Sequence, residues 1–193
     1  MSTRKIATTA VMSALATILM FLEIPLFFMP AFLKFDFSEI PIMIVAFSVG
    51  PWYGVIAELI KNLLHLTVTQ SAGIGELSNF VIGAVYVLSA GYIYKTHKTR
   101  KGAAWSMVFA TLIIAAVAAP FNYFTMLPLY AKVYGMNTEA IIAMCREVNK
   151  LINTKLDVIL WVFVPFNLFK GAVASIITFV IYKPISKFIN KKR

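Results

Sequence analysis

The stretch KFDFSEIPIMIVAFSVGPWYGVIAELIKNLLH, residues 34–65, decides the fold of this chain. It opens as a charged, aromatic loop and continues as two apolar helical segments, which Gly50 and Pro51 separate. Four polar residues of the second segment fall within an arc of roughly 100°, because successive helical residues turn by about 100°. They are Glu58, Lys61, Asn62 and His65. In such apolar surroundings, we expect this polar stripe to face protein or a polar cavity.

The composition indicates one membrane domain over residues 1–193. Of the 193 residues, 60% are hydrophobic and 13% are charged, and a water-soluble domain of this size cannot bury so much apolar surface. The net charge of +10 does not indicate nucleic-acid binding, because the cations cluster between and after apolar segments. The single cysteine, Cys145, excludes an internal disulfide and a cysteine-based metal cluster.

The apolar segments predict an all-α membrane protein with six transmembrane helices. The expected spans are residues 5–22, 38–49, 52–67, 77–94, 103–127 and 156–182. Segment 38–49 is shorter than a full span of about 20 residues, so it either crosses with help from a thinned bilayer or shielding neighbours, or forms a re-entrant hairpin. We expect the first span to be retained, because its apolar run continues past the cleavage-like triplet Ala14-Leu15-Ala16.

The charge distribution predicts that both termini are cytoplasmic. In this topology the inner segments, including the basic loop at 95–101, carry cations and no acid, and every acid except Glu58 falls on the outer side. Prolines at 25 and 30 make residues 23–37 a long external loop, which either covers an apolar ligand or rests among lipid headgroups. Residues 138–152 predict a short amphipathic external helix. Its apolar stripe is Ile141, Cys145, Val148 and Ile152.

Two similar motifs place amides inside the long spans. PFNYF at 120–124 and PFNLF at 165–169 each combine a proline, which kinks a helix, with an asparagine two positions later. Asn122 and Asn167 then either contact a ligand or bond to a neighbouring helix.

Lys170 lies on the same face as Asn167, deep in the last span. An unpaired lysine at such a depth costs roughly 2.5–3.5 kcal/mol, which makes it a functional candidate. The alternative is that Lys170 and Lys61 snorkel or pair with Glu58 or Glu39. In the predicted topology Glu58 is the only acid available within the membrane.

No signature of a catalytic machine occurs. The sequence lacks GxxxxGK[ST], HExxH, GxSxG and a paired aspartate motif. We therefore expect no enzymatic activity, no catalytic residue, no metal and no cofactor. If the protein moves a solute, the energy comes from another protein.

Five motifs follow one another along the chain. They are DFSEIP, SVGPxxGVIAxxxKNLL, GELSNFVIGA, FNYFxxLPLY and VPFNLFKG. In this order they resemble the S components of energy-coupling factor (ECF) vitamin transporters, and among these the riboflavin-specific members. The resemblance implies a six-helix protein of the bacterial cell membrane that captures riboflavin outside. One transmembrane coupling protein and two cytoplasmic ATPases would then drive its release inside.

The resemblance also implies a ligand site near the outer surface. The polar contacts it points to are Asn122, Asn167 and Lys170, followed by Asn62, Glu39 and Asn79. An aromatic wall for the flavin is expected from Phe32, Phe35, Phe121, Tyr123 and Phe124. In the first span, Ala10 and Ala14 form a strip of small residues that spacing assigns either to packing within this chain or to a partner. The family's coupling surface is such a strip, so the resemblance favours contact of Ala10 and Ala14 with a partner protein.

Three other interpretations stay open at this point. The ligand is another planar solute, such as a pterin or a purine, which amides and an ammonium also suit. The chain is a membrane enzyme acting on lipid or prenyl substrates, although this predicts clustered acids at one membrane face and the inner side has none. Or it is an assembly protein whose polar stripe only pairs helices.

Overall fold

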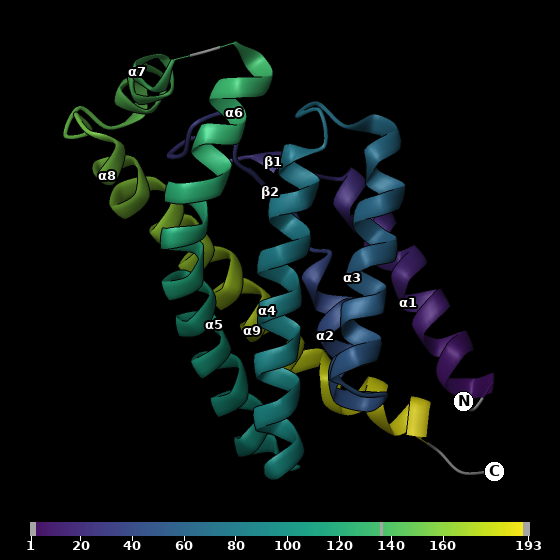
Figure 1. Cartoon of the computed structure of the whole chain (residues 1–193). Helices are drawn as coiled ribbons and strands as arrows, with labels where there is room; N and C mark the ends of the chain where they lie inside the picture. Colours follow the sequence, from purple (N-terminus) through teal and green to yellow (C-terminus); the bar gives the residue numbers. More distant parts are fainter. Residues whose placement is uncertain (1–2, 136, 191–193) are drawn as a thin grey trace.

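The part of the chain that the structure describes, residues 3–135 and 137–190 of a computed structural model, is a bundle of helices (Figure 1). Four apolar helical segments are long enough to cross a membrane: α1 (Thr3–Phe21), α4 (Ile74–Thr96), Arg100–Tyr134 and Lys155–Ile181. Each coincides with one of the expected spans. The prediction of a mostly helical protein with helices that can cross a membrane is therefore confirmed.

Two shorter helices, α2 (Glu39–Ser48) and α3 (Pro51–His65), form the stretch that decides the fold. They meet at Gly50, whose φ of 142° favours glycine, and Pro51 opens α3, where its missing N–H costs nothing. α2 packs against α1, α3, α4 and α9 (Val164–Asn190), and its residues from Glu39 to Phe47 are all buried. Neighbouring helices therefore shield this short helix.

Two long rods are each built from three segments. The first joins α5 (Arg100–Phe121), the π-helical segment η2 (Asn122–Met126) and α6 (Leu127–Tyr134). The second joins α8 (Lys155–Val158), the π-helical segment η3 (Ile159–Phe163) and α9. The first rod continues to Tyr134, beyond residue 127, where we expected the span to end.

The π-helical segments lie beside the two proline motifs. Pro120 directly precedes η2 and Pro165 closely follows η3. A proline removes one backbone hydrogen bond and crowds the carbonyl four residues earlier, which favours an irregular turn. For Pro165 that carbonyl belongs to Trp161, inside η3. For Pro120 it belongs to Ala116, before η2, whereas the carbonyl of Phe124 inside η2 lies four residues before Pro128.

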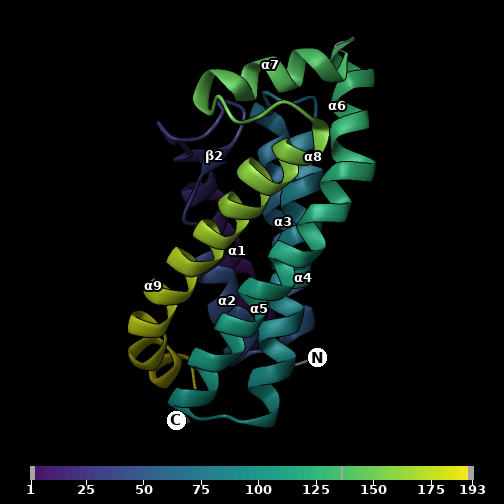
Figure 2. The same cartoon turned by 90° about the vertical axis from the view of Figure 1, so that its left-hand side faces the viewer.

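The outer end of the bundle is closed by short elements (Figure 2). Strands β1 (Ile24–Pro25) and β2 (Lys34–Phe35) pair antiparallel within the expected external loop. The 3-10 turn η1 (Leu66–Val68) follows α3, and α7 (Thr138–Val148) lies across the end of the bundle. The start of α1, the turn between α4 and α5 and the end of α9 lie at the opposite end (Figure 1).

The predicted amphipathic helix exists, but one member of its apolar stripe is wrong. Ile141, Cys145 and Ile152 are buried, whereas Val148 is 41% exposed. Val148 is the last residue of α7, and Ile152 lies beyond the helix, so helical periodicity does not account for the burial of Ile152.

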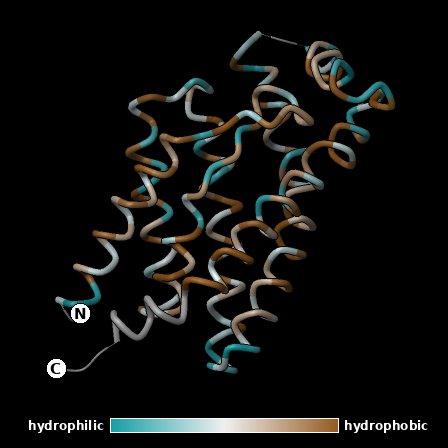
Figure 3. Tube along the Cα trace, turned by 180° about the vertical axis from the view of Figure 1, so that it is seen from behind, coloured by the Kyte–Doolittle hydropathy of each residue, from teal (hydrophilic) through white to brown (hydrophobic). Residues whose placement is uncertain are grey.

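Two apolar clusters hold the bundle together. One lies among α2, α3, α4, α5 and α9, and the other lies toward the outer end, where α7 packs over η3 and α6. Along the trace, hydrophilic residues gather at the turn between α4 and α5 and in the outer segments (Figure 3). This distribution suits a protein whose middle section contacts lipid.

The packing of α7 is tested by its cysteine. Cys145 is fully buried, and burial raises the pKa of its thiol to about 11. Because the thiolate is the reactive form, we expect maleimide to label native Cys145 at pH 7 at least about tenfold more slowly than a cysteine at the exposed position 148. The comparison uses Val148→Cys in a Cys145→Ala background, and equal rates would show that the face of α7 that carries Cys145 is not packed on the bundle.

Candidate functional site

A cavity of about 240 Å³ lies in the outer half of the bundle. Residues of α3, α4, α5 and α9 form its walls, and the loop around β2 and the turn before α4 contribute to its outer end. α4 enters the bundle from the outer end, so Asn79 lies about one turn below Glu76, and Gly83 about one turn below Asn79. The cavity thus extends inward along α4 from the external loops.

A chain of buried charges runs beside the inner part of this cavity. Lys61 Nζ lies 3.0 Å from Glu39 Oε1 and 2.9 Å from Glu58 Oε2. Lys170 Nζ lies 3.0 Å from Asp36 Oδ2 and 3.7 Å from Glu39 Oε1. We call these five residues the charge network. It connects α2, α3, α9 and the loop before α2, and each of its members is buried.

The charge network corrects one expectation. Glu58 is not the only acid available to the buried lysines, because Glu39 and Asp36 are buried beside it. Lys170 pairs mainly with Asp36, which the sequence analysis did not single out. The signal was present in the motif DFSEIP, whose two acids lie three residues apart and directly before an apolar helix.

The loop before α2 is held by Asp36. Its Oδ1 accepts hydrogen bonds from the N–H of Ser38, at 2.8 Å, and from the Ser38 hydroxyl. Burial raises the pKa of Asp36, but the ammonium groups of Lys170 and Lys61 and the Ser38 hydroxyl outweigh this and lower it to about 2. Asp36 is therefore ionised at neutral pH. Ser38 directly precedes α2, and its hydroxyl does not cap the helix.

The two amides of the proline motifs bond within their own helices. Asn122 Nδ2 donates to the carbonyl of Ala118 and Asn167 Nδ2 to that of Phe163, both at 2.8 Å. The structure therefore shows no bond from either amide to a neighbouring helix among the described residues. Both asparagines line the cavity, and Asn122 is 1% exposed.

Three buried oxygens on the cavity wall have no hydrogen-bond donor in the described part of the chain. They are Glu39 Oε2, Asn79 Oδ1 and Asn122 Oδ1. The Asn122 oxygen is assigned by its environment, because the other amide atom must donate to the Ala118 carbonyl. A buried acceptor without a donor costs free energy, so these oxygens suit a ligand that supplies N–H or O–H groups.

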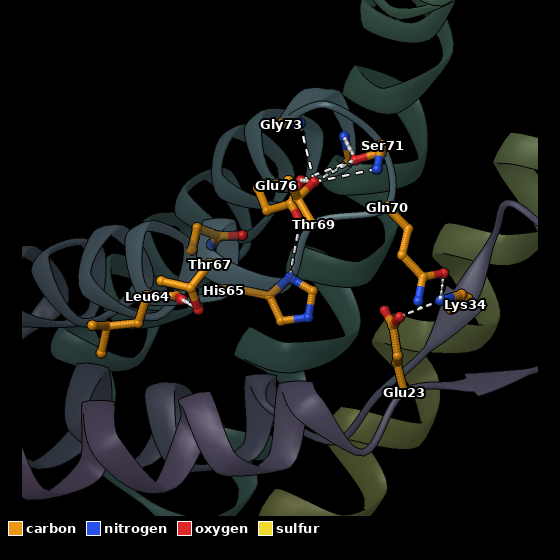
Figure 4. A network of polar contacts seen from close by, with 12 residues as sticks. Glu23, Lys34, Leu64, His65, Thr67, Thr69, Gln70, Ser71, Gly73 and Glu76 are labelled. Atoms are coloured by element: carbon orange, nitrogen blue, oxygen red, sulfur yellow. Dashed lines mark hydrogen bonds and ion pairs between the residues drawn. The ribbon is translucent and has the colours of Figure 1, made fainter.

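The outer end of the cavity is ordered by a second set of contacts (Figure 4). Glu76 Oε1 accepts from His65 Nδ1 at 2.9 Å, and its Oε2 accepts from the hydroxyls of Thr69 and Ser71, each at 2.9 Å. This anchors α4 to α3 and to the turn between them.

A bridge crosses the outer end from the β2 loop to the turn before α4. Lys34 Nζ pairs with Glu23 and donates to Gln70 Oε1 at 2.7 Å (Figure 4). The Tyr134 hydroxyl donates to the Gln70 carbonyl at 2.9 Å, which ties the same turn to α6. Sequence reasoning missed Glu76, Gln70 and Lys34, because their partners lie in loops without a periodic pattern.

Five of the residues that the resemblance pointed to lie together on the cavity wall: Glu39, Asn79, Asn122, Asn167 and Lys170. The remaining candidates lie off the wall. Asn62 donates to the carbonyl and to Oε2 of Glu58, at 2.9 and 3.1 Å. Phe35 packs on Phe169. The Lys155 ammonium lies over the ring of Tyr123, 4.0 Å from the ring centroid.

The aromatic side chains that do line the cavity are Phe32, Tyr86, Tyr130, Tyr134, Phe163 and Phe166. Of these, only Phe32 was among the expected wall residues. Phe124, which was also expected there, is 74% exposed. The π-helical turn at η2 rotates the positions that follow Asn122 relative to a regular α-helix, which changes which aromatic rings face inward.

The alanine strip of α1 faces away from the bundle. Ala10 and Ala14 are exposed, whereas Thr9, Ser13 and Thr17 on the adjacent face of α1 are buried, and each donates to a carbonyl four residues earlier. Packing within this chain therefore does not explain the strip.

Among the described residues, no group of three or more histidine, cysteine or acidic side chains is placed to hold a metal ion.

Comparisons with known proteins agree with one another. Residues 4–182 match the family model described as ECF transporter, substrate-specific component. The chain is 32% identical over 188 residues to "Riboflavin transporter RibU" of Staphylococcus aureus (strain TCH60). The aligned part covers 97% of this chain and 93% of the relative. The chain is 28% identical over 196 residues to "Riboflavin transporter FmnP" of Bacillus subtilis (strain 168), covering 100% and 97%.

A solved structure has the same fold. It is described as "Structure and mechanism of the S component of a bacterial ECF transporter", and it matches with a TM-score of 0.75 and 32% sequence identity. The match covers 97% of this chain and 98% of that chain. The similarity therefore extends over the whole bundle and the cavity within it.

The charge network predicts a large effect on stability. Lys61→Met leaves Glu39 and Glu58 side by side without their shared ammonium, and breaking a buried ion pair costs about 3–5 kcal/mol. We expect the melting temperature of the detergent-solubilised protein to fall by roughly 10 °C. The matched control is Lys150→Met, at an exposed lysine, which should melt within about 1 °C of the parent. Equal melting of both variants would contradict a structural role for the network.

Proposed function

Since the chain belongs to the family of ECF transporter substrate-specific components, as its five motifs indicated, we propose that it captures riboflavin in the outer cavity for delivery to the cytoplasm. The observation that carries this proposal is the convergence of Asn122, Asn167 and Lys170 on one buried cavity. The relatives named riboflavin transporters cover nearly the whole chain.

The chemistry of these three residues suits the polar edge of a flavin. Along its pyrimidine ring, isoalloxazine presents carbonyl and ring-nitrogen acceptors together with one N–H donor. An asparagine oxygen accepts from that N–H, and asparagine N–H groups and an ammonium donate to the acceptors. The oxygen of Asn122 is available for this, because it has no donor among the described residues.

Aromatic side chains on the cavity wall suit the apolar end of the flavin. Phe32, Phe163 and Phe166 offer flat apolar surfaces, and the Tyr130 ring lies 6.2 Å from that of Phe32. Burial of a planar ring system against such side chains provides most of the affinity in sites of this kind. Of the other candidates, Glu39 and Asn79 are proposed as direct contacts. Asn62, Phe35 and Tyr123 support the wall from behind.

The topology proposed for this multi-pass membrane protein is one domain of six spans with both termini in the cytoplasm. Its support is the gathering of positive charge at one end of the bundle. The start of α1, which holds Arg4 and Lys5, and the basic loop between α4 and α5 lie at that end, while α7, which holds Glu139, and the start of α4, which holds Glu76, lie at the other (Figure 1). The outer cavity then opens toward the outside of a bacterial cell.

Transport by this chain needs partners that supply energy. The family is a component of transporters and not a family of enzymes, and the sequence has no nucleotide-binding motif. We assign the energy to two cytoplasmic ATPases that act through one transmembrane coupling protein. The exposed alanine strip of α1 is the surface proposed to meet that protein, because small side chains allow helices to approach closely.

Single substitutions test the ligand contacts. Asn122→Ala and Asn167→Ala each remove a buried polar partner of the flavin, which costs about 1–3 kcal/mol, or roughly tenfold to a hundredfold in affinity. The measurement is quenching of riboflavin fluorescence by the purified variants. Asn153→Ala, at an exposed asparagine, is the control and should bind like the parent. If a pterin or a purine binds more tightly than riboflavin, the ligand has to be reassigned.

The coupling surface is tested by separating binding from transport. Ala10→Leu and Ala14→Leu enlarge the exposed strip of α1 without touching the cavity. We expect riboflavin affinity to stay within about twofold, while uptake by cells that carry the complete transporter falls by about tenfold or more. Ala172→Leu is the matched control, an exposed alanine on α9. Normal uptake with both α1 variants would remove the strip from the proposed interface.

A further inference from the structure

The segment between Glu23 and Lys34 has no polar side chain. It is IPLFFMPAFL, residues 24–33, and we call it the apolar loop. Glu23 and Lys34 pair with each other at its two ends, so together they add no net charge. Loops that lie in water normally carry polar residues. The composition of the apolar loop therefore indicates apolar surroundings on more than one side.

One side of the apolar loop packs on the protein. Met29 is buried in the outer apolar cluster, together with Ile141 and Cys145. Ala31 and Phe32 line the cavity of the candidate site. The loop thus forms part of the cavity wall on this side.

The other side of the apolar loop presents two phenylalanine rings to the surroundings. Phe27 is 95% exposed and Phe28 is 41% exposed. The centroid of the Phe28 ring lies 5.1 Å from that of Phe27 and 5.7 Å from that of Phe169, on α9. We call these three rings the aromatic row. It connects the loop to the surface of α9.

The aromatic row continues into an exposed apolar face of α9. Phe169, Ile176 and Val180 are all exposed, and their spacing places them on one face of the helix. This face belongs to a helical segment that is long and apolar enough to cross a membrane. In a membrane protein such a face meets lipid. The ring of Phe28 therefore packs at the border of a lipid-facing surface.

The depth of Phe169 places this border below the lipid headgroups. Along the segment Lys155–Ile181, Phe169 lies roughly 20 Å from the first residue and roughly 18 Å from the last. The hydrocarbon core of a bilayer is about 30 Å thick, so a residue this far from both ends lies within it. The ring of Phe28, in contact with Phe169, reaches the same layer.

The backbone of the apolar loop suits a place at the edge of the hydrocarbon, where unpaired backbone groups are costly. Pro25 and Pro30 have no N–H group. The N–H of Met29 donates to the carbonyl of Leu26 at 3.0 Å, which closes one turn. The N–H of Leu33 donates to the carbonyl of Pro30 at 2.9 Å, which closes a second turn. These turns lower the cost of holding the backbone near the headgroups while the rings enter lipid.

We propose that Phe27 and Phe28 insert into the outer leaflet of the bilayer beside Phe169, and that this insertion holds the apolar loop against the cavity. Lipid acyl chains are the partner, because the aromatic row is continuous with the lipid-facing side of α9. Moving the loop off the cavity withdraws Phe27 from lipid, and exposing its ring to water costs free energy. The choice of leaflet and the effect on the cavity rest on the proposed function.

The test of insertion places a fluorescent label at position 27. Phe27→Cys in a Cys145→Ala background is labelled with the fluorophore NBD and reconstituted at full length into phosphatidylcholine vesicles. Two quenchers are compared: a doxyl group on the lipid acyl chain, and iodide in the water. We expect doxyl lipid to quench the label at least about half as strongly as at Ile176→Cys, on the lipid-facing side of α9. Iodide should quench it at least about fivefold less than at Glu147→Cys, since an ion does not enter hydrocarbon.

The control at position 147 lies on α7, at the same end of the bundle, and is exposed. A label at position 27 that iodide quenches and doxyl lipid does not would lie in water, which overturns the inference. A label that neither quencher reaches would be covered by protein, such as a second copy of this chain, which also overturns it. Neither measurement requires a bound ligand.

The effect on the cavity is tested by the rate of riboflavin release from the protein in vesicles. Phe27→Asp replaces the ring by a charge that does not enter lipid, and release should become about tenfold faster. Phe27→Leu keeps an apolar side chain and should release riboflavin within about twofold of the parent rate. Parent-like release from Phe27→Asp would show that insertion does not hold the loop. If the parent binds no riboflavin, the proposed function falls, and the quenching measurement alone decides whether Phe27 is inserted.

Discussion

The buried ammonium of Lys61 is the contact on which the arrangement of this bundle depends. It is fully buried and holds acids from two helices, Glu39 of α2 and Glu58 of α3. An ammonium in an apolar interior is stable only with nearby carboxylates and hydrogen bonds, so α2 and α3 have to pack where those carboxylates reach it. Glu39 then lies within reach of Lys170, which fixes α9 and the loop before α2. The position of one cavity wall thus follows from one lysine.

Close helix approach is the second requirement of this arrangement. A Cβ at Gly83 would lie 2.6 Å from Glu58 Cδ, and a Cβ at Gly171 would lie 2.9 Å from Thr111. Glycine at these two positions lets α4 pack directly on the charge network and α9 directly on α5. Both glycines also line the cavity, so the space for a ligand is partly made by side chains that are absent.

The sequence predicted the long helices and five polar residues that line the candidate site. Long apolar segments and the polar stripe on α3 follow a helical period, and the four stripe residues are indeed buried. Asn122, Asn167 and Lys170 stood out because polar groups are costly in apolar spans. Asp36 was missed because its main partner, Lys170, is distant in sequence. Glu76 was missed because Thr69 and Ser71, two of its partners, lie in a turn, where no helical period reports the contact.

Local backbone irregularity affects which aromatic side chains line the cavity. At the two proline motifs the chain is π-helical over η2 and η3. A wider turn changes which side chains face inward, so Tyr130, Phe163 and Phe166 line the cavity while Tyr123 and Phe124 do not. Each asparagine amide donates to the carbonyl four residues earlier, so its Nδ2 is partly used within its own helix.

The balance of charge in the network accounts for the position of Asn62. The network has three carboxyl groups, those of Asp36, Glu39 and Glu58, and two ammonium groups. The two ammonium groups therefore cannot neutralise all three carboxylates. Neutral donors provide the difference: Ser38 donates to Asp36, and Asn62 donates to Glu58 at 3.1 Å. A third lysine would instead have brought another costly charge into the membrane interior. Ser38 and Asn62 lie off the cavity wall, whereas Lys170 and Glu39 line it.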